Sequence, residues 1–211
     1  MSWTLLIMIG ITAYAASGGL IAIEVEYSFI GVFVLGLTTA FGGGTIRNLL
    51  IGAPVSSLWE PQTIAIVFAT LVVIVLLPLE WTSHWKRWGL FFDSIGLATF
   101  ALQGALAVQL IDGHIGLMLL AAMFTGLGGG MIRDLLAGKQ PLALKEEIHA
   151  ILTLFCGIYV WLGWTNPLEL TLAVFLVVAI RMAAIHSGVR FHLPYRFAKT
   201  KNSFSKSTEK I

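Results

Sequence analysis

The fold of this chain is decided by one stretch of sequence that occurs twice. It reads Phe41-Gly42-Gly43-Gly44-Thr45-Ile46-Arg47-Asn48-Leu49-Leu50 and returns as Leu127-Gly128-Gly129-Gly130-Met131-Ile132-Arg133-Asp134-Leu135-Leu136. Each copy places three glycines and then an arginine inside an apolar segment. Glycine destabilises a helix interior by about 1 kcal/mol relative to alanine, and an arginine in apolar surroundings is costly. A chain that does this twice is expected to build a site there.

The composition is that of a membrane protein. Of the 211 residues, 57% are apolar and only 11% are charged, and the mean hydropathy is +0.88. Apolar runs of roughly 20 residues recur, each long enough to cross a hydrocarbon core of about 30 Å. We therefore expect an all-α polytopic protein with one transmembrane domain, residues 1–190, followed by a basic cytoplasmic tail, residues 191–211. Seven spans are predicted at about Trp3–Ile23, Ser28–Ile51, Thr63–Leu79, Leu90–Leu110, Ile115–Ala137, Ile148–Trp164 and Leu168–Ser187.

The basic residues between these spans fall on one side of the predicted membrane. They occupy the third loop, the fifth loop and the C-terminal tail, at Lys86, Arg87, Lys139, Lys145 and from Arg190 to Lys210. The positive-inside rule then places the N-terminus outside and the C-terminus in the cytoplasm, in the inner (plasma) membrane of a cell. Arg181 and His186, near the end of the last span, are interpreted as an anchor at the cytoplasmic surface.

The two glycine stretches belong to a longer repeat with an offset of 86 residues, in which Gly18 also matches Gly104. The repeat is three helices long, covering residues of about 3–81 and about 88–164, with a seventh helix at about 168–187. Because three crossings reverse the side of entry, the copies are predicted to be inverted about an axis in the membrane plane. The second and fifth helices would then be antiparallel, each kinked or broken by its glycines. The alternative is that the glycines only allow close helix packing.

Four charged side chains within the predicted spans are candidate pore-lining or gating groups, namely Arg47, Arg133, Asp93 and Asp134. Asp93 and Arg133 are predicted at similar depth near the cytoplasmic side. We expect them to form an ion pair, since each would otherwise be an unpaired ion in apolar surroundings. The repeat equivalent of Asp93 is Ile7, so Arg47 has no symmetric carboxylate partner. The alternative for Arg47 is that its side chain extends to the outer membrane interface.

Uncharged polar residues in the spans give weaker signals. Ser17 and Gln103 occupy equivalent positions, where they either line a path or tie helices together, and the sequence favours neither. Thr45, Asn48 and Thr125 are further candidates for the lining of a path. Threonine hydroxyls in membrane helices more commonly bond backbone carbonyls, which is the alternative for Thr45 and Thr125.

These residues resemble those of the prokaryotic trimeric intracellular cation (TRIC) channels, some bacterial members of which carry the label glycine transporter. The resemblance rests on the doubled glycine motif, the three-plus-three-plus-one plan and an acid early in the fourth span, and it covers about residues 1–190. It implies a homotrimer whose protomers each hold a pore between the kinked second and fifth helices. It also implies passive flow of monovalent cations, chiefly potassium. The first motif has Asn48 where the second has Asp134, so the two copies are not identical. This difference leaves open whether the two halves of the repeat have equal roles.

The sequence therefore predicts a monovalent cation channel, in which backbone carbonyls at the helix breaks replace part of the ion's hydration shell. A secondary carrier for a small zwitterion such as glycine is the alternative, because inverted repeats and broken helices also occur in carriers. Motifs for metal or nucleophilic catalysis are absent from the sequence, so no enzyme, metal or cofactor is expected beyond permeant potassium or sodium and bound lipid. Membrane lipids are expected partners and nucleic acid is not.

Overall fold

The computed structural model describes residues 3–77, 82–111 and 114–187. The predicted basic tail, residues 191–211, and the last residues of the first repeat lie outside these ranges. The described residues form α1 (Trp3–Glu24), α2 (Phe29–Leu50), the short 3₁₀ helix η1 (Val55–Leu58), α3 (Pro61–Leu76), α4 (Thr82–Gln109), α5 (Ile115–Leu136), the short α6 (Leu142–Lys145), α7 (Glu147–Trp161) and α8 (Pro167–Ser187). The predicted all-α class is confirmed.

Five of these helices, α1, α2, α4, α5 and α8, are long and apolar enough to cross a membrane. The other two predicted spans correspond to α3, with 16 residues, and α7, with 15. At 1.5 Å per residue each of these is about 24 Å long or less, which is shorter than the hydrocarbon core of about 30 Å. The structure thus contains five clear spans and two shorter apolar helices, in a multi-pass membrane protein.

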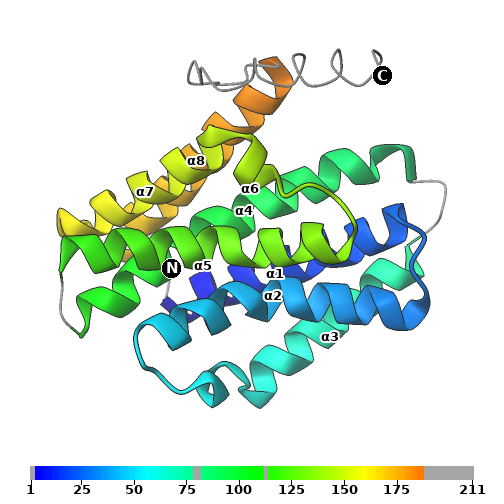
Figure 1. The fold of residues 1–211 in the computed structure, drawn as a ribbon, viewed down its shortest axis with the longest axis horizontal. Coiled ribbons are helices and arrows are strands. Elements are labelled where there is room, and N and C mark those ends of the chain that lie inside the picture. Colours follow the sequence, from blue (N-terminus) through cyan, green and yellow to red (C-terminus); the bar gives the residue numbers. More distant parts are fainter. Residues whose placement is uncertain (1–2, 78–81, 112–113, 188–211) are drawn as a thin grey trace, which may run out of the picture.

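The repeat is visible in the helix boundaries. The first residues of α2 and α5, Phe29 and Ile115, and their last residues, Leu50 and Leu136, are all related by the 86-residue offset. The short elements η1 and α6 follow at equivalent places, and α3 and α7 both begin directly after an equivalent glutamate. Figure 1 shows that α2 and α5 run side by side in opposite directions, as the inverted repeat predicts.

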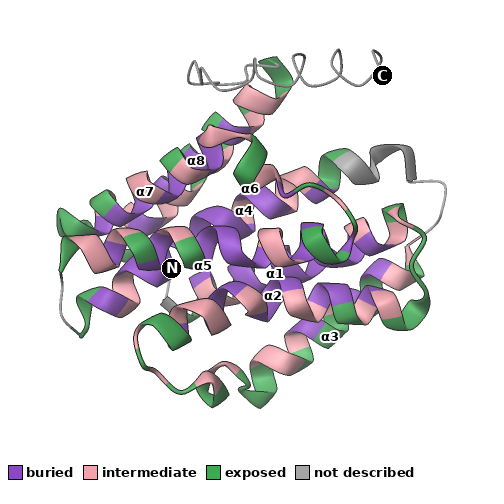
Figure 2. Ribbon diagram, in the orientation of Figure 1, coloured by how far each residue is buried: buried purple, intermediate pink, exposed green. Residues whose placement is uncertain are grey.

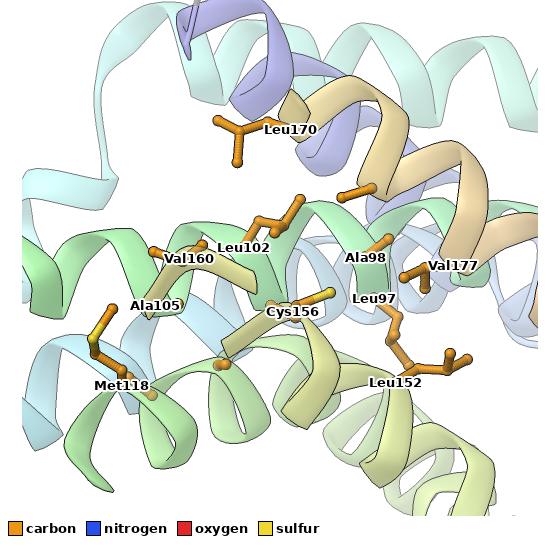
Figure 3. Close-up of a cluster of buried hydrophobic side chains, with 14 of the residues drawn as sticks. Leu97, Ala98, Leu102, Ala105, Met118, Leu152, Cys156, Val160, Leu170 and Val177 are labelled. Atoms are coloured by element: carbon orange, nitrogen blue, oxygen red, sulfur yellow. The ribbon is translucent and has the colours of Figure 1, made fainter. Parts of the chain in front are cut away.

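The centre of the molecule is made by α1, α2, α4 and α5, with α3 packed on α1 and with α7 and α8 packed on α4. Figure 2 shows that buried residues concentrate on these central helices, whereas α3 and α8 present more exposed positions. Figure 3 shows the apolar cluster of the second half, in which Leu97, Leu152, Cys156 and Val177 meet from α4, α7 and α8. Because lipid is as apolar as these side chains, such contacts hold helices together by close packing.

The predicted interruption of the second and fifth helices is wrong, because α2 and α5 are helical without a gap through both glycine triplets. The glycines lie where the two helices cross. A Cβ atom added at Gly43 would overlap the carbonyl oxygen of Thr125, and one added at Gly129 would overlap that of Thr39. The propensity cost of glycine is therefore offset by close contact between two backbones, which is the alternative that the sequence had left open.

Candidate functional site

Asp93 is the centre of a buried cluster of charged side chains. Its Oδ1 atom lies 2.5 Å from Nη1 of Arg133, and its Oδ2 atom accepts a hydrogen bond from Nη2 of Arg181. The three side chains come from α4, α5 and α8, and all three residues are buried. The predicted Asp93–Arg133 ion pair is thus confirmed, and it has a third member from outside the repeat.

Arg133 is held by further acceptors. Its Nε and Nη2 atoms donate to Oδ1 of Asp134 at 2.9 Å and 2.7 Å. Its Nη1 atom donates to the hydroxyl of Ser17 on α1 at 2.6 Å, and Ser17 in turn donates to the carbonyl of Gly89 on α4 at 3.1 Å. Two arginines and two aspartates leave the cluster formally neutral, which is the condition for burying such groups at tolerable cost. Ser17 therefore ties helices together, one of its two predicted roles.

The buried position of Arg181 contradicts its interpretation as an anchor at the cytoplasmic surface. The residue is fully buried, and besides Asp93 its Nη2 atom faces Nε2 of His149 at 2.7 Å. Nδ1 of His149 lies 3.2 Å from the carbonyl oxygen of Glu146, which assigns the proton to Nδ1 and leaves Nε2 to accept from Arg181. Sequence reasoning placed Arg181 wrongly and did not single out His149. The available signal was the cost of an arginine in an apolar span, which calls for a partner.

The equivalent arginine of the first half has a different environment. Arg47 is half-buried, and its Nε atom donates to Oδ1 of Asn48 at 3.0 Å. Within the described ranges, the structure places no carboxylate at ion-pair distance from Arg47, whereas Arg133 has two. Ile7 takes the place of Asp93. The predicted difference between the two arginines is confirmed.

The exchange of Asn48 for Asp134 follows from the turn that each one holds. Nδ2 of Asn48 donates to the carbonyl of Pro54 at 2.9 Å, just before η1. Oδ2 of Asp134 accepts instead from the backbone N–H of Leu142 at 3.0 Å, at the start of α6. A carbonyl needs a donor and an N–H needs an acceptor, so an amide serves the first turn and a carboxylate the second.

Two cavities lie at opposite ends of the central helices, one beside each arginine. The Arg47 cavity, of about 280 Å³, is lined by Arg47, Gln103 and Phe100. The Arg133 cavity, of about 210 Å³, is lined by Arg133, Asp93 and further residues that include Glu24 and Lys139. A void of about 10 Å³ next to it, close to the size of one water molecule, is bounded by Tyr14.

Repeat-related aromatic residues separate the two ends. The rings of Tyr14 and Phe100, which the offset of 86 residues relates, have their centroids 4.9 Å apart. Phe100 borders the Arg47 cavity, and Tyr14 borders the void near Asp93. The Tyr14 hydroxyl also donates to the carbonyl of Gly126 on α5. We call this pair the aromatic partition.

The remaining predicted residues divide between the cavities and the helix contacts. Gly44 and Gln103 line the Arg47 cavity, and Gly130 borders the small void. Gly42, Gly43, Gly128 and Gly129 lie at the crossing of α2 and α5. Hydroxyls of Thr45 and Thr125 donate to carbonyls of their own helices, those of Phe41 at 2.9 Å and Ala121 at 2.5 Å, which is the alternative role.

The model of the glycine transporter family matches this chain twice, at residues 4–78 and at residues 90–165. The chain belongs to the glycine transporter family. The two matches coincide with the two halves of the repeat. The UPF0126 membrane protein YvgT of Bacillus subtilis is 47% identical over 186 residues, which cover 87% of this chain and 92% of that protein. The UPF0126 inner membrane protein YadS of Escherichia coli is 33% identical over 195 residues, covering 88% and 91%.

Solved structures similar to this member of the glycine transporter family are TRIC channels. A prokaryotic TRIC channel crystallised in 0.5 M KCl superposes with a TM-score of 0.77 at 29% identity, covering 90% of this chain and 98% of that one. The TRIC orthologue from Rhodobacter sphaeroides gives a TM-score of 0.74 at 30% identity, covering 89% and 98%. The resemblance inferred from the doubled motif is confirmed.

Proposed function

We propose that this protein is a channel for monovalent cations, mainly potassium, with a conduction path inside each protomer. The observation that carries the proposal is the pair of repeat-related cavities at opposite ends, separated by the aromatic partition of Tyr14 and Phe100. The similarity to solved TRIC cation channels supports the same conclusion and favours it over a carrier for a small zwitterion.

The proposed path runs from the Arg47 cavity past Phe100 and Tyr14 to the void beside Asp93, and on to the cavity that Glu24 lines. It flanks the contact between α2 and α5, because their glycines touch and leave no room for an ion between the two helices. The carboxylates of Asp93 and Asp134 neutralise Arg133, which otherwise would repel a cation at this end. Closure by packed aromatic rings is a known kind of hydrophobic gate.

The setting of the path in the membrane is part of the proposal. We infer that the shorter helices α3 and α7 also cross the bilayer, which gives seven crossings, with the N-terminus outside and the C-terminus in the cytoplasm. The positions of the basic loops support this orientation. Three protomers would assemble as in the TRIC channels. The glycine triplets are the proposed places at which α2 and α5 kink during gating, since glycine resists bending least.

The test is electrical. Purified protein in a planar bilayer should give unitary current steps, and the reversal potential should follow a potassium gradient more closely than a sodium gradient. Phe100→Ala should raise the fraction of time spent open, since it removes half of the partition, whereas Phe175→Ala, at an exposed position of α8, should not. Saturable glycine counterflow without unitary currents would overturn the channel proposal.

A further inference from the structure

The two arginines of the repeat differ in a way that has a chemical consequence. In the second half, Asp93 and Asp134 give Arg133 two carboxylate partners. In the first half, the offset of 86 residues places Ile7 and Asn48 at those positions. Arg47 therefore keeps its positive charge but has neither carboxylate, and its side chain borders a cavity of about 280 Å³.

A second polar side chain, that of Gln103, lies in the same cavity. Gln103, on α4, is only 4% exposed, and its Nε2 atom has no hydrogen-bond partner among the described residues. Its equivalent in the other half, Ser17, is fully bonded in the ion cluster. A buried amide without a partner costs roughly 1–3 kcal/mol, so a group that accepts a hydrogen bond from it is favoured.

Arg47 offers only donors, and Gln103 adds the unpaired donor of its amide. Among the described residues, the guanidinium of Arg47 is hydrogen-bonded only from Nε to Asn48, so its two terminal nitrogens can bind a ligand. A carboxylate has two oxygens that match the parallel N–H groups of a guanidinium and can also accept from an amide. In the other half, Asp93 supplies one carboxylate oxygen to Nη1 of Arg133 from within the chain.

We propose that the Arg47 cavity is a binding site for a small carboxylate, which takes the place that the Asp93 carboxylate holds in the other half. The guanidinium of Arg47 binds the carboxylate oxygens, and the amide of Gln103 donates to one of them. Glu60 also lines the cavity. A simple carboxylate such as acetate uses only the first two residues, and an amino acid such as glycine also places its ammonium group near Glu60.

Binding is measured on the full-length protein in detergent, by saturation-transfer NMR with ¹³C-acetate and with ¹³C-glycine in potassium-containing buffer. Wild type should saturate in the millimolar range, the range that a ligand of so few atoms reaches. Arg47→Gln and Gln103→Leu should each weaken binding by about tenfold or more, since the first removes the charged guanidinium and the second removes the amide donor. Arg87→Gln, at an exposed position of α4, is the matched control and should bind as wild type does.

A further variant tests the symmetry argument itself. Ile7→Asp supplies a carboxylate from α1 as Asp93 does from α4, so it should abolish acetate binding although Arg47 is still present. The size-exclusion profile and thermal unfolding report whether each variant is folded. If Ile7→Asp is not folded, Arg47→Gln and Gln103→Leu decide whether the cavity binds a carboxylate. Loss of glycine binding but not of acetate binding in Glu60→Gln would identify the ammonium contact.

Three results would overturn the proposal: no saturable binding of acetate or glycine, undiminished binding in Arg47→Gln, or equal displacement by chloride at the same concentration. The last would make this a site for any anion. These measurements require no ion flow, so the inference stands or fails independently of the channel proposal.

Discussion

Replacing Asp93 by asparagine should destabilise the protein, because it leaves Arg181, a residue outside the repeat, without its carboxylate partner. The substitution keeps the shape of the side chain and removes its charge. Arg133 retains Asp134 at 2.7 Å, but Arg181 loses its carboxylate partner while fully buried. Removing one member of a buried ion pair costs about 3–5 kcal/mol, most of it for the charge left behind. We expect the free energy of unfolding to fall by this amount in Asp93→Asn.

A double-mutant cycle with Arg181→Met tests whether the unpaired charge of Arg181 causes the loss of stability. In the double variant the uncompensated charge is gone, and Arg133 with Asp134 is again neutral. The coupling energy should therefore be about 2–3 kcal/mol, well above the 0.5 kcal/mol scatter of independent sites. The free energies come from SDS titration in mixed micelles, followed by intrinsic tryptophan fluorescence.

The control is an ion pair of similar geometry at the surface. Lys139 and Glu24 lie 3.0 Å apart with about a third of each side chain exposed, so Lys139→Gln should change the free energy of unfolding by about 1 kcal/mol at most. If Asp93→Asn and Arg181→Met are additive, the two residues do not share one electrostatic cluster, and the reasoning above is refuted.

Two other substitutions test the helix crossing and the turns. Gly129→Ala places a methyl group against the carbonyl of Thr39 and should lower the free energy of unfolding by about 1–3 kcal/mol in the same SDS titration. In the control Gly89→Ala, the nearest atom to the added methyl group is 3.9 Å away, so the substitution should be tolerated. Equal effects of the two substitutions would count against a close crossing. Asn48→Asp makes the first motif match the second but removes the hydrogen-bond donor to the carbonyl of Pro54, so it should lower the unfolding temperature. An unchanged unfolding temperature would disprove the roles assigned to the amide of Asn48 and the carboxylate of Asp134.

Much of the architecture is predictable from the sequence because the repeat constrains it. One offset relates the boundaries of α2 and α5, and the parity of three helices implies their opposite directions. The Asp93–Arg133 pair is also predictable, since both residues were expected at one depth and neither is stable alone in apolar surroundings.

The incorrect predictions concern tertiary contacts that local sequence does not contain. Helix propensity alone indicates a break at three glycines, but the contact of Gly43 and Gly129 with the opposite backbone keeps both helices intact. Arg181 was assigned to the surface because it lies near the end of its span. Its partners Asp93 and His149 are 88 and 32 residues away in the chain, and the repeat provides no second copy from which to infer them.

The ion cluster also has an order of assembly. Asp93 and Arg133 are made and inserted before α8, which is the last helix in the described part of the chain and carries Arg181. Until α8 arrives, one oxygen of the Asp93 carboxylate has no cation to pair with. Chains that stop ahead of residue 181 therefore retain an unbalanced buried charge. Through this one electrostatic contact, the stability of the central helices depends on whether translation has passed Arg181.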